Sequence, residues 1–230
     1  MINRRFQVLP VGDAAVMVVL GSSLRPADVR RSRAIAATLA EAFGPAALDV
    51  VPAFASVLVR FDRSLAELAQ VMACARGAAE AAAEQPPPVT RALRVGVCFG
   101  GQHGPDLDEV ARAARLAPDR VCELFCAADY EVAFLGFVAG FPYLLGLPEQ
   151  LAVARLQTPR LRVPAGSVAV AGVQCGIYPR ACPGGWRVLG RTAATLFDPA
   201  ADPPAAFRPG DSVRFFAVER LEDATLSICA

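Results

Sequence analysis

Glycine and proline are dense, without forming a repeat, between Leu135 and Arg191. Aromatic side chains stand beside these glycines, and arginines interrupt the apolar runs. The aromatic residues are Phe137, Phe141, Tyr143, Tyr178 and Trp186, and the arginines are Arg160, Arg162, Arg180, Arg187 and Arg191. Glycine serves where φ must be positive or where the backbone must approach another group closely. The stretch therefore predicts either a turn-rich barrel whose glycines only form corners, or a surface that binds a ligand.

Short strands separated by turn residues are predicted along and around this stretch. The expected strands are Leu93–Phe99, Tyr130–Phe137, Ala165–Ala171, Gly176–Tyr178, Trp186–Thr192 and Val213–Val218. Two helices are expected between the first two strands, one opened by a capping box of Asp106 and Glu109 and one that begins at Pro118. Many short strands with regular turn signals predict a closed or nearly closed β-barrel.

The first part of the chain has a different pattern, with strands and helices in alternation. The expected strands are Phe6–Leu9, Ala14–Leu20, Leu48–Val51 and Ser56–Phe61. The expected helices are Pro26–Phe43, with Arg30, Arg31 and Arg33 on a solvated outer face, and a second helix opened by a Ser64–Glu67 capping box. This order predicts a small sandwich with both helices on one face of a sheet.

Gln85 and the three prolines that follow it, Pro86–Pro88, mark the expected domain boundary. Consecutive prolines cannot continue a helix and form a stiff, extended spacer. The sequence therefore predicts an α+β protein with an N-terminal domain over residues 1–88 and a barrel domain over residues 89–230.

The charged residues exclude several functions. The formal net charge is +1, which gives no sign of a nucleic-acid surface. All 23 basic residues are arginine, so the chain lacks the lysine of a phosphate-binding loop or a Schiff base. An anion must therefore be held by arginine, by backbone N–H groups or by the end of a helix. His103 is the single histidine, and we interpret it as a variable loop residue.

Cysteine usage and hydrophobicity indicate where the chain works. There are seven cysteines, an odd number, and no secretory signal precedes them, so free thiols in the cytoplasm are expected. Their spacing predicts no metal site. The longest uncharged run near the centre, Val132–Pro148, is broken by glycine and proline, so no membrane span is expected.

The motif residues of the barrel domain fit a small, polar, anionic amide. Gln174 offers a donor and an acceptor, Ser167 a hydroxyl, and Tyr178 a phenol. Arginines can clamp a carboxylate or phosphate through paired N–H bonds. Each residue also has a purely structural interpretation, since Tyr178 can be part of the core and Arg191 can pair with Asp198.

Three long motifs resemble one known family. They are Gly136–Leu144, Thr158–Pro179 and Cys182–Thr192, and shorter matches occur at Val11–Val16, Phe99–Ala111, Phe197–Pro199 and Arg208–Asp211. These segments resemble the family of the 5-oxoprolinase B subunit, also described as allophanate hydrolase subunit 1 or the carboxyltransferase domain, subdomain C and D. The resemblance implies a cyclophilin-like barrel as the C-terminal domain.

The resemblance also implies an activity. Members act with a carboxyltransferase A/B-type subunit, and with a third subunit, in the ATP-dependent cleavage of 5-oxoproline to glutamate. On this basis we predict catalytic roles for Arg160, Arg191 and Gln174. We predict substrate binding by Phe141, Tyr143, Arg162, Ser167, Tyr178, Gly184, Gly185 and Trp186. The chain has no nucleotide-binding loop of its own, so ATP is expected to be shared with the partner in a site of which this chain supplies half.

Two other functions remain open for such a chain. Some relatives inhibit a sporulation histidine kinase, and others form half of the carboxyltransferase domain of a urea carboxylase. This sequence also departs from the family pattern, with Ala139 in place of a proline, Cys175 where threonine is common, and Cys182 in place of a serine. None of these changes removes an arginine of the motifs or Gln174, so they concern the substrate preference and not the family resemblance.

Overall fold

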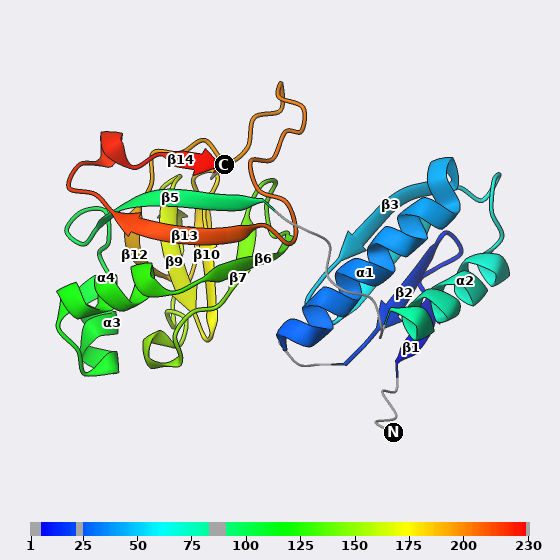
Figure 1. Cartoon of the computed structure of the whole chain (residues 1–230), viewed down its shortest axis with the longest axis horizontal. Helices are drawn as coiled ribbons and strands as arrows, with labels where there is room; N and C mark the ends of the chain where they lie inside the picture. Colours follow the sequence, from blue (N-terminus) through cyan, green and yellow to red (C-terminus); the bar gives the residue numbers. More distant parts are fainter. Residues whose placement is uncertain (1–5, 22–24, 83–90, 229–230) are drawn as a thin grey trace. The chain divides into compact units, whose positions relative to one another are not determined.

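The computed structural model of the chain describes residues 6–21, 25–82 and 91–228. The chain divides into two compact units, Met1–Val89 and Thr90–Ala230, which are drawn in Figure 1. The predicted spacer, Gln85–Pro88, lies outside the described residues. The exact domain boundary therefore stays a prediction, and each unit is described by itself.

The first unit is a four-stranded antiparallel sheet with two helices on one face. The strand order is β1-β2-β4-β3, with β1 Gln7–Pro10, β2 Ala15–Val19, β4 Ser56–Phe61 and β3 Ala47–Pro52. The helices are α1 Pro26–Phe43 and α2 Leu68–Ala81, and a short 3₁₀ turn, η1 Gly44–Ala46, follows α1. Val16 and Val59 of the sheet share one buried cluster with Leu39 of α1 and Val71 of α2, so both helices cover the same face as predicted.

Two local predictions for this unit are wrong. The helix α2 has no capping box, because the Ser64 N–H and hydroxyl both donate to the Asp62 carboxylate, at 2.8 and 2.7 Å, and the N-cap residue is Glu67. Arg31 and Arg33 are not on a solvated face but are buried, with 6% and 8% of their surface exposed. A long arginine side chain can reach past its own helix, and the Arg31 guanidinium donates to the Ala79 carbonyl of α2 at 2.6 Å.

The second unit contains a closed barrel of seven strands, which confirms the predicted fold class. The order around the barrel is β12-β9-β10-β7-β6-β13-β5, and β5 pairs with β12 to close it, with Gly190 opposite Phe99 and Arg191 opposite Cys98. Strand β14 lies outside β5, and β8 and β11 form a separate pair. The bounds are β5 Ala92–Phe99, β6 Tyr130–Leu135, β7 Pro142–Leu145, β8 Arg160–Val163, β9 Ser167–Ala171, β10 Gln174–Ile177, β11 Cys182–Gly184, β12 Arg187–Arg191, β13 Ser212–Ala217 and β14 Leu226–Ile228.

Two helices cover part of the barrel. These are α3 Leu107–Ala114 and α4 Pro118–Ala127, and Figure 1 shows α4 running alongside β13. The short 3₁₀ turns are η2 Glu149–Leu151 and η3 Leu221–Asp223. Phe125 of α4 packs on Tyr130 and Phe215, with ring centroids 5.2 and 4.8 Å away, so the helix is held by an aromatic contact with the barrel wall. Asp106 is the N-cap residue of α3, but its side chain does not cap the helix, so the predicted capping box is wrong.

A bilayer-spanning helix needs a long and strongly apolar segment. None of the helices over residues 6–21, 25–82 and 91–228 meets that requirement.

Candidate functional site

A pocket of about 250 Å³ opens on the barrel unit, and its wall is mainly aromatic. The residues that line it are Phe137, Phe141, Tyr143, Arg155, Pro159, Tyr178, Pro183, Gly184, Gly185 and Trp186. They come from β7, from β11 and the residues on either side of it, and from the loops that precede β7 and β8. Segments far apart in the sequence therefore meet at one place because the barrel closes.

Phe141 lies at the centre of the aromatic wall. Its ring meets those of Tyr178 and Trp186 edge to face, with centroids 5.2 and 5.5 Å apart, and that of Tyr143 at 5.0 Å. Edge-to-face pairs of this kind fix the orientation of the rings as well as excluding water. The four rings form one connected aromatic cluster in the lining of the pocket.

Gly184 lets this wall close. A Cβ at this position would overlap the Tyr178 hydroxyl and lie 2.9 Å from Cε1 of the same ring. A side chain here is therefore incompatible with the observed position of Tyr178. The double glycine of the motif serves the close approach of backbone to ring at residue 184, whereas a Cβ on Gly185 would meet Pro159 only at an ordinary 3.6 Å.

Phe137 forms an exposed part of the wall and has an unusual backbone. Its φ is +64°, a region that bulky residues rarely adopt, and its side chain is 59% exposed. The Val138 N–H donates to the Gly136 carbonyl at 2.7 Å, which makes a tight three-residue turn with Phe137 at its centre. The ring nevertheless packs on Phe141 at 5.6 Å and on Tyr178 at 6.3 Å. The strained turn thus presents an aromatic side chain at the pocket instead of pointing it away.

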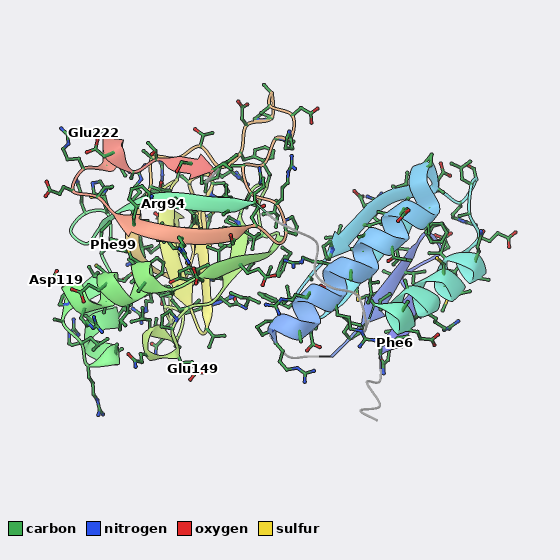
Figure 2. All side chains as sticks on the ribbon, in the orientation of Figure 1. Phe6, Arg94, Phe99, Asp119, Glu149 and Glu222 are labelled. Carbon is green, nitrogen blue, oxygen red and sulfur yellow. The ribbon has the colours of Figure 1, made fainter. Side chains whose placement is uncertain are left out.

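Arg155 supplies the positive charge of the pocket. Its guanidinium carbon lies 5.7 Å from the centroid of the Trp186 ring. No acidic residue in the described part of the chain forms an ion pair with it. Arg155 belongs to the loop between η2 and β8. Glu149, which begins η2, is labelled in Figure 2 on the side of the barrel unit away from Glu222.

The ionisable groups of the pocket stay neutral near pH 7, apart from the arginine. Burial raises the pKa of Tyr178 to about 12, assisted by the nearby Cys182, while the Trp186 backbone and Arg155 act in the opposite direction. Burial also raises the pKa of Tyr143, against the influence of Arg155. Burial raises the pKa of the Cys182 thiol as well, so this cysteine is not an activated nucleophile. The pocket thus offers two phenols, one cation and apolar walls, which suits a small anionic ring compound.

Six of the residues predicted to bind substrate lie together in this pocket. They are Phe141, Tyr143, Tyr178, Gly184, Gly185 and Trp186. Arg162 is exposed on β8, and Ser167 is buried in β9, opposite Arg191 of β12, so neither lines the pocket. Their predicted contact with substrate gains no support from this geometry.

The three residues predicted to be catalytic also lie outside the pocket lining. Arg160 donates two hydrogen bonds to the Asp106 carboxylate, at 2.7 and 2.8 Å, and its pKa is raised by this partner. The Nε of Arg191 donates to the Ala165 carbonyl at 2.7 Å, rather than pairing with Asp198. Gln174 begins β10 beside a tight turn. The catalytic roles of these three residues therefore stay predictions.

Four residues of the pocket were not predicted from the sequence to contact substrate. Phe137 was noted as an aromatic beside a glycine but was not assigned a contact with substrate, and Arg155, Pro159 and Pro183 were not singled out. Pro159 and Pro183 lie within the family motifs. Arg155 lies just before the motif that begins at Thr158, inside the arginine-bearing stretch, and this position was the only signal in the sequence that pointed to it.

The fold and the pocket place the chain in one class of protein. The chain belongs to the family "carboxyltransferase domain, subdomain C and D". The sequence pattern of this family matches residues 6–207. Within this class it is similar to the 5-oxoprolinase B subunit of Bacillus subtilis (strain 168), with 36% identity over 238 residues and 93% of each chain covered. It is also similar to the 5-oxoprolinase B subunit of Escherichia coli O157:H7, with 42% identity over 207 residues, which cover 89% of this chain and 93% of that protein.

Solved structures share the fold of this chain. The protein TTHA0988 is 35% identical with a TM-score of 0.78, and the match covers 90% of this chain but only 40% of that longer one. A conserved uncharacterized protein from Pyrococcus horikoshii is 35% identical with a TM-score of 0.56, and 94% of this chain and 99% of that chain are covered. The urea carboxylase of Kluyveromyces lactis, at 17% identity and a TM-score of 0.74 over 97% of this chain and 24% of that one, shows a shared fold alone.

Proposed function

We propose that this chain is one subunit of an ATP-dependent 5-oxoprolinase and that it binds 5-oxoproline in the aromatic pocket. The observation that carries the proposal is the position of the pocket. Its walls are built from Phe141 and Tyr143 of the first long motif, Tyr178 of the second, and Gly184 and Trp186 of the third. The relatives that cover most of the chain are named as the B subunit of 5-oxoprolinase, and the pocket is where the family motifs of this chain meet.

The size and chemistry of the pocket support a small ring substrate. A volume of about 250 Å³ suits a five-membered lactam with one carboxylate. The rings of Phe141 and Trp186 offer flat apolar contact to the ring carbons, and the phenols of Tyr143 and Tyr178 can donate to a carbonyl oxygen. A small ligand that is mostly enclosed by apolar walls is positioned by a few polar groups.

The reaction requires more than this pocket provides. In the proposed sequence the γ-phosphoryl group of ATP passes to the lactam oxygen, and ADP is released. A first water then adds to the activated ring carbon, and the ring C–N bond breaks as its nitrogen takes up a proton, which gives γ-glutamyl phosphate. A second water hydrolyses this acyl phosphate, releasing phosphate and glutamate. Such phosphoryl transfer depends on positioning and on positive charge around the transferring group.

The described lining contains no carboxylate or imidazole that can act as a base at neutral pH. We therefore propose that a carboxyltransferase A/B-type subunit completes the site and shares the binding of ATP with this chain. The complex is expected to act in the cytoplasm, where ATP is available and free thiols persist.

The test is ADP release on addition of 5-oxoproline, measured with this chain alone, with the co-expressed partner subunit alone, and with the mixture. Release that is stimulated by 5-oxoproline only when both subunits are present supports the proposal. Robust turnover by the lone chain would contradict the shared site. A stable complex that releases no ADP with 5-oxoproline would argue for the carboxylation of another small amide.

A further inference from the structure

The described lining of the pocket contains one arginine, Arg155, whereas Arg160 and Arg191 of the motifs are held elsewhere. Arg160 is committed to Asp106 through two hydrogen bonds, and Arg191 donates to the Ala165 carbonyl. A guanidinium that already makes charge-assisted bonds to a buried carboxylate has little left to offer a ligand. An anionic substrate in this pocket must therefore find its positive partner in a different residue.

The backbone on both sides of Arg155 is tied to neighbouring segments of the barrel unit, on one side to a residue of the pocket. The Leu156 N–H donates to the Gly185 carbonyl at 2.7 Å, so the loop is bonded to the pocket lining beside Trp186. The Ala154 carbonyl accepts a hydrogen bond from Nε of Arg187 at 3.3 Å. Val153, which precedes Ala154, forms an isolated antiparallel β-bridge with Gly172 at the turn between β9 and β10. The position of Arg155 is thus set by three contacts of its neighbours, although its own side chain is exposed.

The guanidinium of Arg155 contacts an aromatic ring and keeps N–H groups that can donate to a ligand. It lies over the Trp186 ring, and no described acidic residue pairs with it. Stacking on an aromatic face leaves the N–H groups around the edge of the guanidinium free to donate. The positive charge also acts on both phenols of the pocket, since it opposes the rise in pKa of Tyr143 and of Tyr178. A guanidinium that lies in a pocket and is not paired with a described acidic residue is suited to bind an anion.

We propose that Arg155 is the specificity-determining residue that binds the carboxylate of the substrate, with the substrate ring against Trp186 and Phe141. The inference rests on the proposed function only for the identity of the ring acid. The anion is a carboxylate carried on a small ring, and Arg155 and the aromatic wall recognise the two parts together.

The experiment uses the fact that Trp186 is the only tryptophan of the chain. Its fluorescence reports binding in the pocket of the full chain without a label. The probes are 5-oxoproline, the uncharged lactam 2-pyrrolidinone, the ring acid cyclopentanecarboxylate, and inorganic phosphate. The variants are Arg155→Gln, Arg155→Lys and, as a matched control on an exposed arginine of α3 outside the pocket, Arg112→Gln.

We expect the unmodified chain to bind 5-oxoproline about tenfold more tightly than 2-pyrrolidinone, since a charge-assisted hydrogen bond is worth roughly this factor or more. Arg155→Gln is expected to lose that preference and to weaken the binding of cyclopentanecarboxylate by about the same factor. Arg155→Lys should restore part of the preference, which a purely structural stacking role would not predict. Arg112→Gln should behave as the unmodified chain.

Several results would overturn the inference. It fails if Arg155→Gln keeps the preference for carboxylates, if Arg112→Gln loses it to the same extent, or if phosphate competes as well as the ring acids. It also fails if Trp186 responds to none of the carboxylates. If Arg155→Gln weakens both ring acids but 5-oxoproline has no advantage over cyclopentanecarboxylate, the role of Arg155 stands and the proposed lactam substrate is wrong.

Discussion

The guanidinium of Arg160 donates two hydrogen bonds to the Asp106 carboxylate, across 54 positions of the sequence. The same carboxylate accepts a third bond from the Val188 N–H at 2.7 Å and is only 3% exposed. One buried acid therefore joins the start of α3, the strand β8 and the strand β12. The pair links three segments of the barrel unit, and the catalytic role of Arg160 stays a prediction.

Arg160→Gln is expected to lower the free energy of unfolding by about 2 kcal/mol, because a buried carboxylate loses its charged partner while the arginine is itself partly exposed. The measurement is urea unfolding followed by the fluorescence of Trp186. Arg162→Gln, on the same strand but exposed, is the control and should change stability little. If Arg160→Gln keeps the stability but abolishes turnover in the assembled enzyme, the catalytic role predicted from the sequence is correct.

Gly184→Ala is expected to weaken binding in the pocket by about tenfold or more, because the new Cβ would displace the Tyr178 ring from the wall. Gly185→Ala is the matched control, since its Cβ would meet Pro159 at 3.6 Å without overlap. Titration of 5-oxoproline against Trp186 fluorescence compares the two. Equal affinities for both variants would show that Tyr178 does not shape the binding site.

The variants Phe137→Gly and Phe137→Ala distinguish the effect of the backbone strain at residue 137 from the effect of its aromatic side chain. Both remove the exposed ring, so both are expected to weaken ligand binding several-fold. Only glycine relieves the strain of φ = +64°, so Phe137→Gly should unfold at a higher temperature than Phe137→Ala, by the equivalent of about 1 kcal/mol. Thermal unfolding and ligand titration of both variants test this. A less stable glycine variant would mean that the turn carries no strain.

Alkaline pH should destabilise the barrel unit partly through Tyr178. The folded-state pKa is raised to about 12 from an ordinary value of 10.0, so the unfolded chain loses the phenolic proton first as the pH rises. The contribution to stability is complete below pH 10 and falls as the pH rises from 10 towards 12. Tyr178→Phe removes this contribution, so its stability should fall less steeply over that window.

Urea unfolding at a series of pH values, together with the ultraviolet absorbance of the phenolate, measures the effect. Tyr143→Phe is a second comparison, because burial raises the pKa of that phenol in the same direction. Identical slopes for Tyr178→Phe and the unmodified chain would show that the Tyr178 hydroxyl is not protected by the fold.

The elements were largely predictable because they depend on local sequence patterns. The periodicity of apolar residues predicted α1 at the bounds that the structure shows, Pro26–Phe43. Pro118 marked the start of α4. The short strands β7, β8, β11 and β14 were not predicted, since three or four residues carry little periodic signal, and β7 and β11 also contain a proline.

The capping prediction at Asp106 failed for a different reason. Asp106 has the residue type and spacing of a helix cap, yet its carboxylate binds Arg160 and the Val188 N–H instead. These partners are 54 and 82 residues away and become neighbours only when the barrel closes. A charge-assisted pair in a buried place outweighs a local bond to the start of a helix.

The sequence by itself determined the class of the fold, the family and the aromatic half of the candidate site, because these depend on patterns and motifs that are continuous along the chain. Only the tertiary structure decided which arginine faces the pocket. A guanidinium can bind any acid or carbonyl within its reach, so its partner depends on which segments the fold brings together. Barrel closure placed Asp106 beside Arg160 and Ala165 beside Arg191, and it left Arg155 over Trp186.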